Sequence, residues 1–188
     1  MKVFVIRHGE SETNRDKRWT GWLDAPLTEK GRADAALARE VLAKAKFDKV
    51  YASDLVRARC TAEIALPGCT YETTPQLREV DLGSLAGKPI ASTTKEQRAL
   101  ISREGYNAFG GESREAFRER VVGFMKALEA EEHQTVALFA HAGWLCEALD
   151  FAVGIKLPRK NVCCNNCTVA VFEYEDAVWR LHSWINPD

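Results

Sequence analysis

Short apolar runs alternate along the chain with longer segments that have the period of a helix. The runs at residues 2–6, 49–52, 135–140 and 167–174 have the length and the β-branched or aromatic content of strands. Those at 2–6 and 135–140 are too continuously apolar to face water on either side, so we expect them to be central, parallel strands. This alternation predicts an α/β fold.

Two helices are predicted in the first half of the chain. Thr28 is a suitable N-cap for a helix that reaches about residue 45. Ser53 and Asp54 are expected to begin a second helix, which reaches about residue 66. The apolar stripe predicted for the first of these helices consists of Ala33, Leu37 and Val41.

Two further helices follow in the second half. Ser113 is expected to begin one of them, and residues 144–153 form the other, which Gly154 ends. The stripe of the helix after Ser113 consists of Phe117, Val121, Phe124 and Leu128. Helices on both faces of the sheet predict a three-layer α/β/α sandwich with a mostly parallel central sheet.

The domain organisation is simple, because we find no repeat and no linker. Residues 1–188 are expected to form a single domain, long enough to bury a sizeable core. The segment from Ser84 to Gly111 has the weakest pattern, and we interpret residues 84–111 as a short, partly helical cap.

Charge and composition exclude several classes of partner. With 46% hydrophobic residues, 28% charged residues and a formal net charge of -1, the chain has no basic footprint for nucleic acid and no membrane-binding patch. It shows neither a secretion signal nor a membrane span, so we expect a cytoplasmic protein, monomeric or homodimeric.

The six cysteines are expected to be free thiols. Cys164 and Cys167 have the spacing of zinc ligands, but no second Cys or His pair stands at a matching interval. We therefore interpret these cysteines as packing residues and predict no metal site.

Candidate chemistry lies where the predicted strands end. Arg7 and His8 follow the first strand, His141 follows the run at 135–140, and Arg57 stands one turn into the helix after the run at 49–52. The carboxyl ends of parallel strands meet at one edge, where α/β folds bind ligands. Two histidines, two arginines and a helix N-terminus suit a phosphate dianion. The alternative is that each arginine pairs with a carboxylate.

An ordered set of motifs points to one family. The motifs are Arg7-His8-Gly9-Glu10, Asn14, DAPLTEKG (24–31), SDLVRARCTA (53–62), LREVDLG (77–83), GGES (110–113) and HAG (141–143). With these motifs in this order, the chain resembles the histidine phosphatase superfamily, also called the phosphoglycerate mutase-like family, over essentially its whole length.

The resemblance implies a phosphoglycerate mutase-like fold and a role for each matching residue. His8 is the nucleophile that becomes phosphohistidine, Glu79 is the proton donor, and His141 donates to a nonbridging phosphate oxygen. Arg7, Asn14, Arg57 and His141 form the phosphate pocket. The positions implied to contact the rest of the substrate are Glu10, Ser11, Thr20, Gly21 and Ala142.

This chemistry predicts a phosphomonoesterase that needs no metal and no cofactor. A neutral imidazole attacks phosphorus while positive side chains hold the oxygens, and a carboxylic acid protonates the leaving alkoxide. Asp81 is a rival to Glu79 for that acid. The expected substrates are small phosphorylated metabolites, with a cofactor-dependent phosphoglycerate mutase or an α-ribazole phosphatase as alternatives.

Two positions depart from the family pattern and concern the substrate pocket. Residues 83–87 read Gly-Ser-Leu-Ala-Gly where the family commonly has Gly-x-Trp-Glu-Gly, and Ala142 replaces a common glycine. Trp19 and Trp22 are candidates for the rim of this pocket.

Two other classes of protein fit less well. A zinc deaminase would need Pro-Cys-x-x-Cys, but Cys163 stands where proline should. A catalytically silent phosphate-binding module would have no need of Glu79. The span from Asp81 to Gly110 is short for the enclosure that a mutase builds, which favours a phosphatase.

Overall fold

The computed structural model describes residues 1–186, which contain one six-stranded sheet in the order β3-β2-β4-β1-β5-β6. Strands β3, β2, β4 and β1 are parallel, whereas β5 is antiparallel to β1 and β6 is antiparallel to β5. The strand bounds are β1 Lys2–Arg7, β2 Lys49–Ser53, β3 Glu72–Thr74, β4 Thr135–Ala140, β5 Val169–Glu175 and β6 Val178–Ile185.

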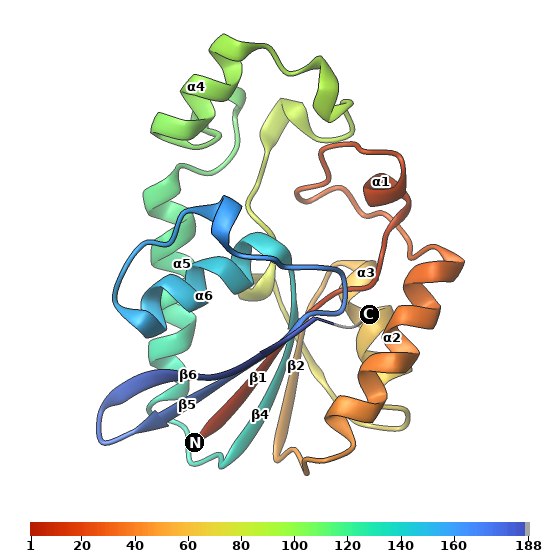
Figure 1. The fold of residues 1–188 in the computed structure, drawn as a ribbon, viewed down its shortest axis with the longest axis vertical. Helices are drawn as coiled ribbons and strands as arrows, with labels where there is room; N and C mark the ends of the chain where they lie inside the picture. The colour runs from red at the N-terminus through yellow and green to blue at the C-terminus, as the bar shows by residue number, and fades with distance from the viewer. Residues whose placement is uncertain (187–188) are drawn as a thin grey trace.

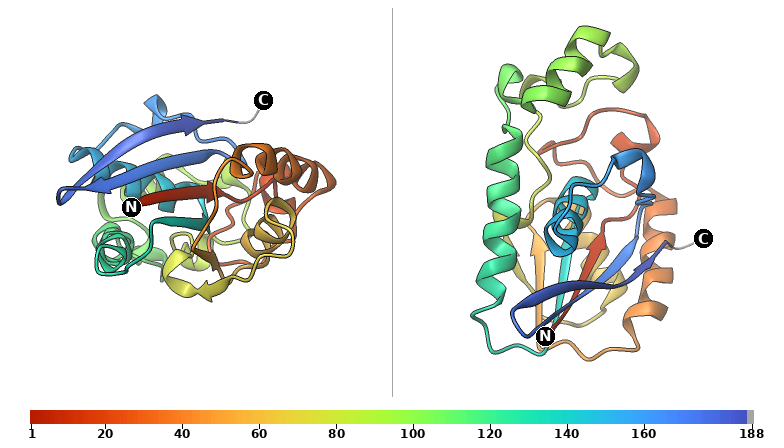
Figure 2. Two further views of the ribbon diagram at one scale, coloured as in Figure 1. Left: turned by 90° about the horizontal axis from the view of Figure 1, so that it is seen from below. Right: turned by 60° about the vertical axis from the view of Figure 1, so that its left-hand side comes forward.

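Helices cover both faces of this sheet. Side chains of α2 (Glu29–Leu42) and α3 (Val56–Ala65) share one hydrophobic cluster with the sheet, and those of α5 (Arg114–Leu128) and α6 (Ala142–Val153) share another. Figures 1 and 2 show α2 and α5 on opposite sides of the strands. The predicted three-layer α/β/α sandwich is therefore confirmed, and so is the mostly parallel sheet.

The core follows the alternation of side chains along the central strands. In β1, Val3 and Val5 pack into the cluster under α5 and α6, while Ile6 packs into the cluster under α2 and α3. All three side chains are fully buried. Burial on both faces explains why this strand reads as a continuous apolar run.

Three predicted helix ends are confirmed. Thr28 accepts a hydrogen bond from the backbone N–H of Gly31, and Ser113 accepts one from that of Ala116, as N-caps do. Gly154 ends α6 in the left-handed conformation, with φ 72°, which glycine adopts without a steric penalty.

The predicted start of α3 is wrong. Ser53 is the last residue of β2, and the helix begins at Val56 with no hydrogen bond from its own N-cap side chain. The carboxylate of Asp24 instead accepts the N–H of Val56 at 2.7 Å. Asp24, from a loop distant in the sequence, thus caps the helix N-terminus in place of the predicted local residues.

The predicted stripe of α2 is wrong at two of its three positions, because only Val41 packs against the core. Ala33 and Leu37 are exposed, and 48% of the Leu37 surface is accessible. The buried positions are Gly31, Ala35, Ala38 and Leu42. Small side chains face the sheet because α2 also packs closely against α3.

Short elements gather at the carboxyl ends of the parallel strands. Helix α1 (Glu12–Arg15) follows β1, and the segment 84–111 contributes α4 (Lys95–Glu104) with the 3₁₀ turns Ile90–Ser92 and Asn107–Phe109. Figure 1 shows α4 at the end of the molecule toward which these strands point. Within residues 1–186, no helix is long and apolar enough to cross a bilayer.

The cysteines are free thiols, as expected. None of the six is paired in a disulfide, and Cys146 and Cys167 are buried. In the described part of the chain, no group of three or more His, Cys, Asp or Glu residues is arranged to hold a metal ion.

Candidate active site

Two histidines meet at the carboxyl ends of β1 and β4. The parallel register sets Arg7 opposite Ala140, and the N–H of His8 donates to the carbonyl of Ala140 at 3.0 Å. His8 and His141 therefore follow adjacent strands, with ring centroids 5.1 Å apart and an interplanar angle of 60°. Both side chains are buried, so the sheet itself fixes their separation.

The tautomer of His8 is fixed by its two neighbours. Nδ1 lies 2.6 Å from the carbonyl oxygen of Gly9, which can only accept, so Nδ1 carries the proton. Nε2 lies 3.2 Å from Nε of Arg57, which can only donate. Nε2 is thus unprotonated, and its lone pair accepts the N–H of Arg57.

Arg57 is held rigidly beneath this pair. Its side chain is fully buried, and its terminal nitrogens donate to the carbonyls of Leu23 at 3.0 Å and Gly21 at 2.8 Å. Burial lowers the pKa of Arg57 to about 10, so the guanidinium remains charged at neutral pH. A buried cation held only by neutral acceptors favours an anionic ligand beside it.

Both imidazoles are neutral near pH 7. Burial is the main cause that lowers the pKa of His8 well below its ordinary value, and the charges of Arg57 and Arg7 add to it. The pKa of His141 falls well below its ordinary value for the same reasons, burial first and Arg57 next. His8 can therefore act as a nucleophile without first losing a proton.

Several buried polar atoms at the site have no partner within residues 1–186. They are both ring nitrogens of His141 and Nε of Arg7. Arg7 is anchored at its far end, where it donates to the carbonyl of Cys164. Unpaired polar atoms in a buried site are costly, and a phosphate oxygen would satisfy the donors among them.

Asn14 is oriented by two hydrogen bonds to its carbonyl oxygen. The N–H of Ser11 donates to it at 3.2 Å and the side chain of Asn166 at 3.3 Å, which leaves the amide nitrogen of Asn14 free to donate. Asn166 also donates to the carbonyl of His8 at 3.0 Å, so it braces two loops of the site.

Glu79 reaches the same pocket from the segment before the cap. Its carboxylate accepts the backbone N–H groups of Gly143 and Val80, both at 3.0 Å. The backbone of Glu79 is held too, because Trp22 donates to its carbonyl at 2.7 Å and Arg120 at 3.1 Å. The carboxylate is thus fixed in the same pocket as His8 and Arg57.

A pocket of about 260 Å³ joins these groups. Of the residues proposed from the sequence, it is lined by Arg7, His8, Asn14, Thr20, Gly21, Arg57, Glu79 and Ala142. His141 lies fully buried against His8.

Two proposed substrate contacts lie outside this pocket. The Glu10 carboxylate accepts the hydroxyl of Thr28 at 2.8 Å, at the start of α2. Ser11 is fully buried, where it caps α1 and bonds to the Thr13 hydroxyl at 3.0 Å. Both side chains thus have partners within the chain, and their role in substrate binding stays a prediction.

The family assignment follows from the whole chain. A family model described as the histidine phosphatase superfamily (branch 1) matches residues 3–187. The chain belongs to this superfamily.

Several named proteins are similar to this chain over 90% or more of their own length. "Probable phosphoglycerate mutase GpmB" of Salmonella paratyphi A is 28% identical over 194 residues, which cover 98% of this chain and 90% of the relative. The solved structure of a phosphoglycerate mutase from Thermus thermophilus has a TM-score of 0.80 and 31% identity, covering 100% of both chains. A "putative alpha-ribazole-5'-P phosphatase" from Escherichia coli has a TM-score of 0.79 and 25% identity over 97% of this chain and 94% of its own.

The pocket of this superfamily member also includes side chains that sequence reasoning did not assign to it. They are Arg18, Val80, Leu82, Ile90, Tyr106 and Gly143. Gly143 was part of the HAG motif, which is the one signal that pointed to it. Tyr106 packs against Trp19 with ring centroids 6.1 Å apart, and burial, followed by the charge of Glu79, raises the pKa of Tyr106 to about 12.

The two tryptophans have different places. Trp19 lines the pocket, as the sequence suggested. Trp22 lies beside it, where the guanidinium of Arg78 stacks 4.7 Å from the ring centroid. Its indole N–H donates to the Glu79 carbonyl, so Trp22 positions the carboxylate-bearing segment.

Proposed function

We propose that this protein is a metal-independent phosphomonoesterase that hydrolyses small phosphorylated metabolites through a phosphohistidine on His8. The observation that carries the proposal is the fixed tautomer of His8. Its Nδ1–H donates to the carbonyl of Gly9, and its unprotonated Nε2 lies in a pocket that Arg57 and Glu79 also line.

The reaction has two displacements at phosphorus. In the first, the Nε2 lone pair of His8 forms a bond to phosphorus, the ester P–O bond breaks, and protonated Glu79 gives its proton to the leaving alkoxide. In the second, Glu79 takes a proton from water, the water oxygen bonds to phosphorus, and the N–P bond breaks. The electron pair of that bond returns to Nε2.

Two arginines and two neutral side chains bind the oxygens of the transferred phosphoryl group. Arg7, Arg57, Asn14 and His141 present donors for the equatorial oxygens, whose charge is redistributed in the transition state. Phosphate release is expected to continue in EDTA and to stop in vanadate, which mimics five-coordinate phosphorus. Loss of activity in EDTA with recovery on adding a divalent ion would contradict metal independence.

The substrate is best sought with a panel. Sugar phosphates, phosphoglycerates, nucleotides and α-ribazole phosphate should be compared by free phosphate release, with the His8→Ala protein as blank. The likeness to the Escherichia coli protein makes α-ribazole phosphate a named candidate on that panel. No release from any member above the His8→Ala blank would overturn the proposed activity.

A phosphoglycerate mutase is the second candidate, because relatives carry that name. A mutase must keep water from its phosphohistidine, and here the segment 84–111 lines the active-site pocket only through Ile90 and Tyr106. This small contribution supports hydrolysis. With 3-phosphoglycerate and catalytic 2,3-bisphosphoglycerate, phosphate release should exceed formation of 2-phosphoglycerate. The reverse order would favour the mutase.

A further inference from the structure

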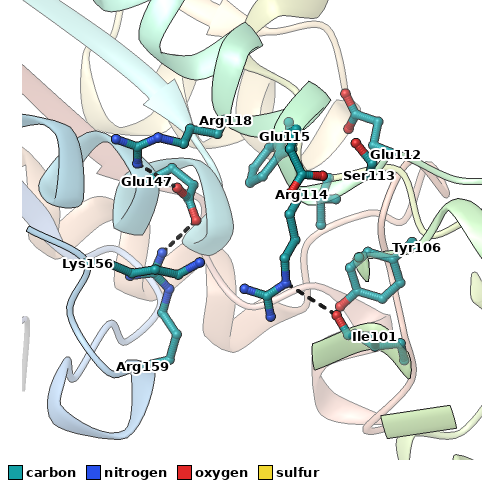
Figure 3. A pocket seen from close by; sticks show the side chains of 13 residues that line it. Ile101, Tyr106, Glu112, Ser113, Arg114, Glu115, Arg118, Glu147, Lys156 and Arg159 are labelled. Atoms are coloured by element: carbon teal, nitrogen blue, oxygen red, sulfur yellow. Dashed lines mark hydrogen bonds and ion pairs between the residues drawn. The ribbon is translucent and has the colours of Figure 1, made fainter. Parts of the chain in front are cut away.

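A second pocket of about 260 Å³ adjoins the active site. It lies between the start of α5, the residues after α4, and the segment that follows α6 (Figure 3). Val80 and Tyr106 line both this pocket and the one that contains His8. The two pockets therefore share part of their walls at Val80 and Tyr106.

Most charges in the wall of the second pocket are already paired. Arg159 contacts Glu147 at 2.6 Å and Asp150 at 2.8 Å, and Arg118 contacts Glu147 at 3.5 Å. Figure 3 shows Glu147 between these two arginines. Pairs of this kind leave little net charge for a ligand to meet.

The carboxylate of Glu112 is likewise already paired. Its carboxylate accepts from Arg120 at 2.8 Å and from the backbone N–H of Asp81 at 2.8 Å. Glu115, the remaining acid of the wall, is exposed in the first turn of α5. Glu115 also lines the pocket, but it forms no ion pair within 4.0 Å with any cation of this wall among the described residues.

Two cations in this wall have no carboxylate within 4.0 Å among the described residues. Arg114 contacts only the carbonyl of Ile101, at 3.4 Å, and Lys156 forms no ion pair. In Figure 3 their charged ends point toward each other across the pocket. The N-terminus of α5 adds partial positive charge on the same side. Two like charges that face each other are relieved by an anion between them.

We propose that the second pocket binds an anionic group at the far end of the substrate, a carboxylate or a second phosphoryl group. The inference rests on the proposed function, because it assigns a substrate class to the same enzyme. The aromatic ring of Tyr106 and the side chain of Val80 contact the chain between the two charged ends. The preferred substrates are thus phosphomonoesters that are anionic at both ends.

Matched substrates test this directly. 6-Phosphogluconate and sorbitol 6-phosphate are both open-chain and differ at the far end, where the first has a carboxylate and the second a hydroxymethyl group. Fructose 1,6-bisphosphate and fructose 6-phosphate provide the same comparison for a second phosphoryl group. The doubly anionic member should have a kcat/KM about threefold to tenfold higher, and the ratio should shrink in about 0.5 M salt. Equal kcat/KM values within both pairs would overturn the proposal.

Variants locate the effect. Arg114→Met and Lys156→Met remove one charge each while keeping an unbranched stem, and each should reduce the ratio toward one without changing hydrolysis of sorbitol 6-phosphate. Arg103→Met is the matched control, because Arg103 is exposed on α4, pairs with Glu104 and lies outside both pockets. A preference that survives in both pocket variants would contradict the assignment.

Measurements of affinity test the proposed anion subsite independently of the proposed phosphatase activity. Titration of the His8→Ala protein with the same four compounds measures affinity without turnover. Tighter binding of the doubly anionic compounds, lost in the His8→Ala/Arg114→Met protein, supports the subsite even if no compound is hydrolysed by the wild type. Equal affinities refute the subsite, while release of phosphate by the wild type would leave the phosphatase activity standing.

Discussion

The backbone N–H of Gly143 donates to Oε2 of Glu79 at 3.0 Å, and a Cβ at position 143 would lie 2.3 Å from Oε1 of the same carboxylate. Gly143 belongs to the first turn of α6, where backbone N–H groups have no partner within the helix. The helix that begins after His141 thus holds the candidate acid directly, and only glycine leaves room for it.

Gly143→Ala should therefore lower the rate of phosphate release much more than it lowers the stability of the fold. The new methyl group displaces the Glu79 carboxylate, and we expect kcat to fall about tenfold or more, as general-acid contributions of about 10²–10⁴-fold allow. The measurements are phosphate release and the urea midpoint. Gly123→Ala in α5 is the control, because its Cβ would meet nothing within 4 Å. It should gain about 0.5–1 kcal/mol of stability with unchanged activity. Full activity in Gly143→Ala would contradict the role given to this contact.

Glu79→Gln should slow the enzyme in a way that depends on the leaving group. With alkyl phosphates, whose alkoxides need a proton, the rate should fall by about 10² or more. With p-nitrophenyl phosphate, whose leaving group is a stable anion, the loss should be much smaller. Asp81→Asn is the matched variant, because Asp81 bonds to the N–H of Gly83 and does not line the pocket. Equal losses with both substrates would place the acid elsewhere.

Much of this site could be predicted because its key residues follow the most regular part of the chain. His8 and His141 come directly after two continuous apolar runs, and parallel strands bring such positions together without any knowledge of side-chain packing. The sandwich followed from the same alternation. Thr28, Ser113 and Gly154 were found because their capping partners lie within a few residues.

The features that were missed depend on contacts between distant segments. Asp24 caps α3 from a loop that comes before β2, so no sequence pattern near the start of α3 predicts this cap. Asn166 braces Asn14 from the other end of the chain, and β6 is held by pairing with β5. The stripe of α2 was misplaced because alanines outnumber larger apolar residues there, and burial is decided by close packing on α3.

The buried histidines make the stability of the protein depend on pH. In the folded protein the pKa values of His8 and His141 lie well below the ordinary value of 6.5, so both rings stay neutral while those of the unfolded chain take up protons. Stability is therefore complete above about pH 6.5 and is lost as the pH falls toward the folded pKa values. The slope is at most about 2.7 kcal/mol per pH unit for two protons.

Urea unfolding between pH 7.5 and pH 5 measures this slope, roughly above the range in which carboxylates titrate. His141→Asn should remove about half of it. Gly123→Ala, which changes no titratable group, should leave the slope unaltered. A stability that stays level over this range, or an unchanged slope in His141→Asn, would contradict the burial of neutral rings.

The most direct test of the account is to look for phosphate on His8 itself. Rapid quench of the enzyme in alkaline detergent during turnover of a ³²P-labelled phosphomonoester should trap a protein-bound label that survives alkali and is released by acid. Mass spectrometry should place it on His8, and His8→Ala should show neither label nor phosphate release. A label on another residue, or hydrolysis undiminished in His8→Ala, would contradict the proposed mechanism.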